Sequence, residues 1–162
     1  MTHLTVSMPA PDFSLPNHAG EIISRSGLQG SYVVLYFYPK DDTPGCTTEA
    51  LDFTRLHQEF AQAGAVILGI SKDSTASHCS FIAKHSLNVM LLSDEQGSMC
   101  EAYGVWTEKS MYGKKYMGIE RTTLLLDKDG VIRHIWNKVK VTDHAEDVLE
   151  KLRTLAQAAH AA

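Results

Sequence analysis

The chain has 162 residues, of which 44% are hydrophobic, and a formal net charge of −4 at pH 7. This size and composition are sufficient for a single domain, residues 1–162, whose core folds without disulfide staples. The charges are interspersed, with no basic block of the kind that binds a phosphate backbone, so we expect no nucleic acid partner.

The sequence predicts neither a membrane-spanning helix nor a secretion signal. The longest apolar stretches have about the length of a strand, whereas a membrane span needs roughly 20 residues. Residues 1–16 lack a charged start followed by an apolar core. We therefore expect a soluble, cytoplasmic protein without a membrane partner.

The first predicted strand lies in the N-terminal quarter of the chain. Residues 8–16 hold too many prolines for a helix and lead into a turn at residues 17–20. Residues 31–38 are a continuous β-branched and aromatic run, which is typical of a strand buried on both faces. Pro39 is expected to end this strand.

A helix is predicted directly after this strand, with a cysteine in its first turn. Thr43 is the expected N-cap, Pro44 suits the first helical position, and apolar residues recur at helical spacing until Gly64. Cys46 therefore lies where unpaired backbone N–H groups point at its sulfur. These donors favour the thiolate, which is the nucleophilic form of cysteine.

The rest of the chain predicts further strands and helices in alternation. Residues 65–71 read as a second buried strand, and Ser74 can cap a helix that runs to about residue 86. Residues 121–127 and 131–136 flank an Asp-Gly turn and form an antiparallel hairpin. The remaining expected elements are a strand over 89–92, helices over about 95–103 and 143–155, and a frayed alanine-rich tail over about 156–162. The pattern predicts an α/β fold with a mixed sheet.

Cysteine and histidine usage indicates a reactive thiol rather than a disulfide framework or a metal site. The three cysteines, Cys46, Cys79 and Cys100, are odd in number and irregular in spacing, so at least one thiol stays free. The eight histidines are scattered, and the chain has no Cys-x-x-Cys or His-x-x-x-His pair. We expect no bound metal.

The spacing Pro-x-x-x-Thr-x-x-Cys, formed by Pro39, Thr43 and Cys46, resembles the active-site signature of peroxiredoxins. Residues 37–49, 100–106 and 118–124 are similar to the bacterioferritin-comigratory, or Q-type, branch of that family. The resemblance covers nearly the whole chain. It implies a thioredoxin-like fold, with a mixed central sheet flanked by helices and an N-terminal extension. It also implies a monomer that needs no cofactor, neither haem nor flavin.

The resemblance assigns a peroxide-reducing site to four residues. Cys46 corresponds to the nucleophile, Thr43 and Arg121 to the groups that stabilise the growing negative charge, and Pro39 to the residue that shields the pocket. The planar fork of Arg121 can touch the sulfur and a peroxide oxygen together, so lysine would be a poor substitute. Glu49, one turn after Cys46, pairs with a local cation or is a solvated carboxylate, and the sequence leaves both readings open.

Attack on a peroxide leaves Cys46 as a sulfenic acid. A second thiol must condense with this sulfenic acid before excess peroxide oxidises the sulfur further. One group of relatives carries this resolving cysteine at the position of Leu51, and another at the position of Ile82. Cys79 precedes Ile82 by three residues and shares its helix face. We hypothesise that Cys79 resolves Cys46; Cys100 and an external thiol are the alternatives.

The expected function is thiol-dependent reduction of hydrogen peroxide and organic hydroperoxides, with recycling by a thioredoxin-like or other thiol reductant. A one-cysteine peroxidase and a redox-regulated holdase or binding protein are the alternatives. A disulfide oxidoreductase normally needs Cys-x-x-Cys, which is absent around Cys46. A Cys-His hydrolase is weaker still, because no histidine is singled out as a base.

Overall fold

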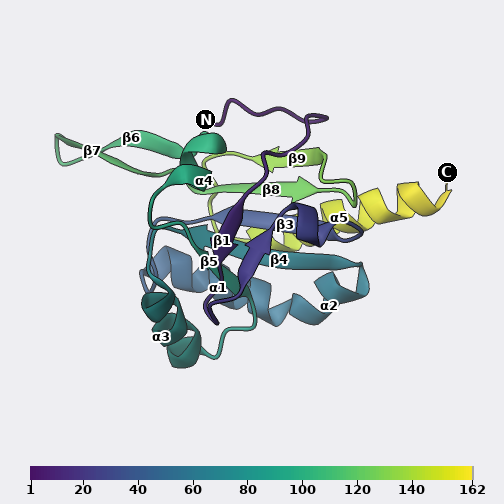
Figure 1. Cartoon of the computed structure of the whole chain (residues 1–162), viewed down its shortest axis with the longest axis horizontal. Coiled ribbons are helices and arrows are strands. Elements are labelled where there is room, and N and C mark those ends of the chain that lie inside the picture. Colours follow the sequence, from purple (N-terminus) through teal and green to yellow (C-terminus); the bar gives the residue numbers. More distant parts are fainter. Residues whose placement is uncertain (162) are drawn as a thin grey trace.

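The computed structural model describes the backbone of residues 1–161 and the side chains of residues 1–159. Its centre is a five-stranded sheet in the order β5-β4-β3-β8-β9 (Figure 1). Its strands are β3 (Tyr32–Phe37), β4 (Ala65–Ser71), β5 (Met90–Ser93), β8 (Thr122–Leu126) and β9 (Ile132–Trp136). β3 pairs in parallel with β4 and antiparallel with β8, and β8 pairs antiparallel with β9. The predicted mixed sheet is confirmed.

The central strand β3 is buried along its whole length because both faces of the sheet are covered. Successive side chains of a strand point to opposite faces. Val34 and Tyr36 pack with the helices of one face, whereas Val33, Leu35 and Phe37 pack with the N-terminal extension and a short helix on the other. The unbroken apolar run that predicted this strand therefore supplies two cores.

Helices cover both faces of the sheet (Figure 1). The helices are α1 (Pro44–Arg55), α2 (His57–Gln62), α3 (Thr75–His85), α4 (Ser98–Ala102) and α5 (His144–Ala161), with a 3₁₀ turn at Ser26–Leu28. Side chains of α1, α2, α3 and α5 share one core cluster, and α4 contributes to the other. Within the part of the chain that the structure describes, no helix has the length and apolar character needed to cross a membrane.

The helix expected from Pro44 to Gly64 is divided into α1 and α2 at Leu56. The backbone of Leu56 leaves helical geometry, with φ −96° and ψ 2°, although its N–H still binds the Asp52 carbonyl at 3.2 Å. Leu56 and Phe60 are both buried, so the interruption keeps the apolar side on the core. Gly64, at φ +83°, ends α2 in the left-handed conformation that glycine favours.

Two other helices differ in length from their predictions. α4 begins at Ser98 rather than near Glu95, because the Asp94 carboxylate accepts from the N–H groups of Met99 and Cys100 and so caps the helix later. α5 continues to Ala161, so the residues expected to fray from Ala156 are helical, as their alanine content favours. Residue 162 lies outside the described residues.

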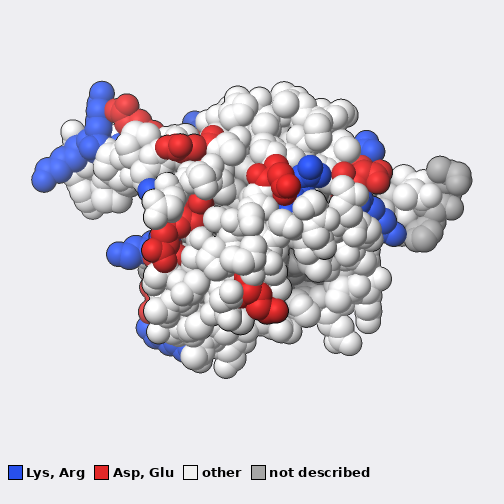
Figure 2. Space-filling model, in the orientation of Figure 1, with Lys and Arg blue, Asp and Glu red and all other residues white. Residues whose placement is uncertain are grey.

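Two hairpins form separate two-stranded sheets beside the central one. The predicted turn at residues 17–20 joins β1 (Ser14–Pro16) to β2 (Ile22–Ser24). No element was predicted for the segment that forms β6 (Trp106–Met111) and β7 (Lys114–Ile119), an antiparallel pair that projects from the body (Figure 1). Figure 2 shows basic side chains at the end of this projection, while acidic and basic groups are interspersed over the rest of this face.

Candidate active site

Cys46 lies in the first turn of α1, immediately beyond the loop that follows β3. Only 1% of its surface is exposed, and its thiol is not part of a disulfide. The first N–H groups of a helix have no partner within the helix and carry partial positive charge. The sequence therefore places the sulfur, as predicted, at an electropositive helix end that excludes bulk water.

Arg121 contacts the sulfur from the other side of the site. It precedes β8, and its Nη2 donates to Cys46 Sγ at 3.4 Å while its Nη1 donates to Glu49 Oε1 at 2.7 Å. Burial alone lowers the pKa of Arg121, but the negative charges of Glu49 and Cys46 outweigh burial and raise it. The guanidinium therefore stays charged beside the thiol. The predicted pairing of Arg121 with Cys46 is present in the structure.

Glu49 is a buried carboxylate, not a solvated one. Only 1% of its surface is exposed, and among the described residues its Oε2 has no hydrogen-bond partner. Burial raises the pKa of Glu49 to about 7, although Arg121 acts in the opposite direction. Of the two readings left open by the sequence, the ion pair is correct, and its cation is Arg121.

Gly45 has a role that sequence reasoning missed. A Cβ added at this position would lie 3.2 Å from Arg121 Nη2, which is closer than nine in ten real Cβ contacts. The absence of a side chain therefore lets the guanidinium approach the first turn of α1. The only sequence signal was the glycine itself, placed between Pro44 and Cys46.

Thr43 occupies the N-cap position of α1 but does not cap the helix with its hydroxyl. Its backbone is extended, at φ −91° and ψ 156°, and its carbonyl accepts from Thr47 N–H at 2.8 Å. The hydroxyl instead donates to the Lys40 carbonyl at 2.8 Å, because the loop bends back over it. The predicted side-chain cap is wrong, and a role of this hydroxyl toward peroxide stays a prediction.

Pro39 forms part of the wall of a cavity of about 420 Å³ at the base of the β6–β7 hairpin. The cavity combines apolar and cationic side chains. Its lining residues are Pro39, Lys40, Lys72, Trp106, Lys109, Tyr116, Met117, Gly118 and Ile119. Burial, helped by the charge of Arg121, lowers the pKa of Lys109. The cavity therefore borders the loop before Cys46 at Pro39 and Lys40.

The other two cysteines lie in different environments. Cys79 is exposed on α3, and its thiol donates to the His18 carbonyl at 3.0 Å. Cys100 is buried in α4, where burial and the neighbouring Asp94 raise the pKa of its thiol far above the usual range. Cys100 is therefore held as an inert thiol. The structure brings Arg121 to Cys46 but does not join Cys79 to Cys46.

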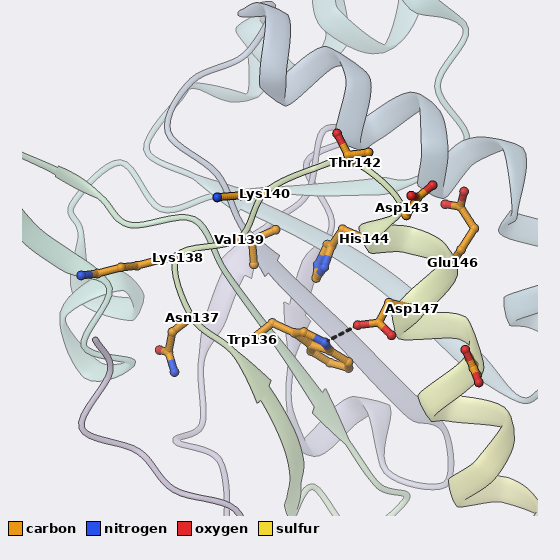
Figure 3. A pocket seen from close by; sticks show the side chains of 11 residues that line it. Trp136, Asn137, Lys138, Val139, Lys140, Thr142, Asp143, His144, Glu146 and Asp147 are labelled. Carbon is orange, nitrogen blue, oxygen red and sulfur yellow. Dashed lines mark hydrogen bonds between the residues drawn. The ribbon is translucent and has the colours of Figure 1, made fainter.

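A wider groove of about 640 Å³ lies between β9 and the start of α5 (Figure 3). Its wall includes Trp136, whose indole donates to Asp147 at 3.0 Å, and His144, which bonds to the Thr123 hydroxyl at 2.9 Å. The groove is lined by none of the predicted site residues. Val139 in its wall connects the groove to the active site, because its N–H donates to the Arg121 carbonyl at 2.9 Å.

Comparisons with known proteins agree with this geometry. A family model described as the AhpC/TSA family matches residues 6–135. A putative peroxiredoxin bcp of Coxiella burnetii is 51% identical over 149 residues, covering 92% of this chain and 99% of that protein. Peroxiredoxin Bcp of Bacillus subtilis is 47% identical over 154 residues, covering 95% of this chain and 98% of that protein.

Solved structures give the same relationship. A structure of the Xanthomonas campestris bacterioferritin comigratory protein, described for its alkyl peroxide reduction activity, superposes with a TM-score of 0.87 at 44% identity. The match covers 96% of this chain and 99% of that one. The predicted thioredoxin-like fold is thus confirmed. With Arg121 against the buried Cys46 and this breadth of similarity, the chain belongs to the AhpC/TSA family and, within it, to the Bcp or Q-type peroxiredoxins, which are thiol-dependent peroxidases.

Proposed function

We propose that this peroxiredoxin reduces hydrogen peroxide and organic hydroperoxides with Cys46, resolves the product with Cys79, and is recycled by a thioredoxin-like donor. The contact of Arg121 with the Cys46 sulfur is the observation that supports the first of these steps. The Xanthomonas campestris relative is described as reducing alkyl peroxides, which supports organic hydroperoxides as substrates. The mixed apolar and cationic cavity beside Pro39 is suited to such molecules.

In the first step, the Cys46 thiolate attacks the terminal oxygen of the peroxide. A sulfur–oxygen bond forms, the oxygen–oxygen bond breaks, and the leaving alkoxide or hydroxide takes a proton and departs as alcohol or water. Negative charge moves from sulfur to the leaving oxygen during this step. Arg121 lies beside the sulfur and keeps a fixed positive charge there, so it stabilises that transfer without rearrangement.

In the second step, the Cys79 thiolate attacks the sulfur of the Cys46 sulfenic acid. The disulfide bond forms, the sulfur–oxygen bond breaks, and the leaving hydroxide takes a proton and departs as water. A dithiol donor then reduces the disulfide by thiol–disulfide exchange and is itself oxidised. Exposure of Cys79 and the inert environment of Cys100 support Cys79 as the resolving thiol. The monomeric state and the cytoplasmic location stay predictions of the sequence.

The test is to treat reduced protein with one equivalent of hydrogen peroxide, block the free thiols, and map the cysteines by non-reducing peptide mass spectrometry. A Cys46–Cys79 disulfide is expected. It should be absent from Cys79→Ser and retained in Cys100→Ser. Free Cys79 beside a Cys46 sulfenic acid would show resolution by an external thiol, and an unmodified Cys46 would contradict the peroxidase proposal for this residue.

A further inference from the structure

We propose that His78 is a positioning residue, which holds the active-site loop, residues 39–43, onto α3 through Asp41. We further propose that the Asp41–His78 contact opens before Cys79 reaches Cys46. The second statement rests on the proposed role of Cys79. Nothing in the catalytic geometry uses His78, although it is fully buried one residue before Cys79.

Asp41 connects the active-site loop to α3. Its carboxylate accepts from the Tyr38 hydroxyl at 2.6 Å, from the Ser77 hydroxyl at 2.8 Å and from His78 Nδ1 at 2.8 Å. Ser77 and His78 both belong to the first half of α3. The backbone N–H of Asp41 also donates to Asp73 Oδ2 at 2.8 Å. The loop before Cys46 therefore has a buried polar connection to α3.

Both ring nitrogens of His78 are engaged in buried hydrogen bonds. Its Nδ1 lies 2.8 Å from the Asp41 carboxylate, and its Nε2 lies 3.0 Å from the Leu92 carbonyl. Neither ring nitrogen is then free to bind a metal. Asp41, Asp73 and His78 have ligand atoms within 4.8 Å of one another. We interpret this cluster as a hydrogen-bond network rather than a metal site. The buried pair joins the loop to both α3 and β5.

A second link is weaker because it is exposed. Asp42 accepts from Lys84 Nζ at 2.6 Å and from His85 Nε2 at 2.8 Å, both on α3. Exposed ion pairs contribute little to stability, whereas a buried charge that loses its partner is strongly unfavourable. The Asp41–His78 contact is therefore the stronger of the two links.

Cys79 faces away from this contact. Consecutive residues of a helix are rotated by roughly 100°, and the Cys79 thiol binds the His18 carbonyl in the β1–β2 turn while His78 binds the loop. Turning Cys79 toward Cys46 therefore withdraws its neighbour His78 from Asp41. The Asp41–His78 contact and a Cys46–Cys79 contact therefore exclude each other. Opening of the Asp41–His78 contact controls how fast the Cys79 thiolate attacks the Cys46 sulfenic acid.

Two substitutions separate the two bonds of His78. His78→Asn keeps a donor near the position of Nδ1, toward Asp41, and His78→Gln keeps one near the position of Nε2, toward Leu92. The matched controls are Ser80→Ala, exposed on α3, and Ile132→Ala, a core substitution on the opposite face of the sheet. Stability of each variant is measured so that rates are compared at a known loss of stability.

Rapid mixing of reduced protein with hydrogen peroxide separates sulfenic acid formation from disulfide formation. We expect His78→Gln to form the Cys46–Cys79 disulfide about tenfold faster, the change that losing one charge-assisted hydrogen bond produces. Sulfenic acid formation should slow in the same variant, because the loop is no longer held. His78→Asn should remain close to wild type. Opposite changes in the two steps are not expected from a general loss of stability.

Equal disulfide rates in wild type and His78→Gln, or the same acceleration in Ile132→Ala, would overturn the proposal. Hydrogen exchange of residues 39–43 in the reduced protein gives a readout that does not need Cys79. If no variant forms the Cys46–Cys79 disulfide, the proposed role of Cys79 and the gating of its attack both fail. Faster loop exchange in His78→Gln alone then still supports His78 as the positioning residue, and unchanged exchange refutes that role too.

Discussion

Arg121 and Cys46 meet side chain to side chain although they are 75 positions apart in the sequence, with Nη2 3.4 Å from Sγ. The second nitrogen of the same guanidinium is held by Glu49 at 2.7 Å. A planar fork can satisfy both partners at once, whereas an ammonium is a single point charge. The orientation of the cation at the sulfur therefore depends on a buried carboxylate one turn along α1.

Arg121→Lys tests the fork. We expect the rate constant for peroxide reduction to fall by about 100-fold, the scale of losing one preorganised donor at a developing charge. Stopped-flow measurement of sulfenic acid formation gives this rate. Arg133→Lys is the control, because Arg133 lies on β9 and its half-exposed side chain pairs with Asp127, away from Cys46. A change of less than threefold in Arg121→Lys would refute an essential role for the fork.

Gly45→Ala separates stability from activity. Alanine is more favourable than glycine in a helix by up to about 1 kcal/mol, so the substitution should not lower the stability of α1. The added Cβ would press on Arg121 Nη2, which must move by a few tenths of an ångström. We expect slower peroxide reduction with an unchanged or higher melting temperature. Thr48→Ala, exposed on the same helix, should leave the rate unchanged. A variant as fast as wild type would contradict the steric argument.

Local patterns in the sequence predicted most of the fold. The continuous apolar run predicted β3, the Asp-Gly pair predicted the β8–β9 hairpin, and Ser74 predicted the start of α3, where its hydroxyl accepts from Ser77 N–H. The β6–β7 hairpin escaped prediction because its strands are half-exposed and mainly polar. Its turn combines Tyr112 and Gly113, both with positive φ, and tyrosine gives no signal for that conformation.

The site was only partly predictable for a different reason. Cys46 was found from its own neighbourhood, and Arg121 through the family resemblance. Glu49 and His78 depend on burial by distant segments, and no local pattern shows whether a carboxylate or an imidazole is exposed. Their partners, Arg121 and Asp41, lie 72 and 37 positions away in the chain. Such roles become visible only when the fold brings the elements together.

Glu49 predicts a pH dependence of stability. Its pKa is about 7 in the folded chain against an ordinary 4.5, so between these values the unfolded chain loses the proton first. Its contribution to stability is present below pH 4.5 and is lost as pH rises to 7, by up to about 3 kcal/mol. Urea unfolding at a series of pH values should show this slope in wild type relative to Glu49→Gln. Parallel curves for the two proteins would refute the assignment.

His144 predicts the opposite slope in nearly the same range. Burial lowers its pKa to about 4 from 6.5, so the unfolded chain takes up the proton first as pH falls. Its contribution to stability is present above pH 6.5 and is lost toward pH 4, again by up to about 3 kcal/mol. Wild type should therefore appear nearly flat between pH 4.5 and 6.5. Relative to it, Glu49→Gln should lose stability on acidification and His144→Gln should gain it. A single variant that stays flat would contradict the compensation.

The last prediction moves the proposed resolving thiol along α3. Ile82 is half-buried and packs against the core cluster that contains Cys46, one turn beyond Cys79. Cys79→Ser should abolish the intramolecular disulfide, and Cys79→Ser with Ile82→Cys should restore it, because both positions reach the site as α3 unwinds stepwise from its first turn. Non-reducing peptide mass spectrometry after one equivalent of peroxide distinguishes the variants.

The rates in the double variant carry further information. A cysteine at position 82 is farther from His78 along the helix, so more of α3 has to unwind before it meets Cys46, and we expect slower disulfide formation than in wild type. Cys79→Ser with Ala83→Cys is the control, since Ala83 is exposed on a different side of α3. Disulfide formation at equal rates from positions 82 and 83 would mean that α3 opens as a whole, and would contradict stepwise unwinding from its first turn.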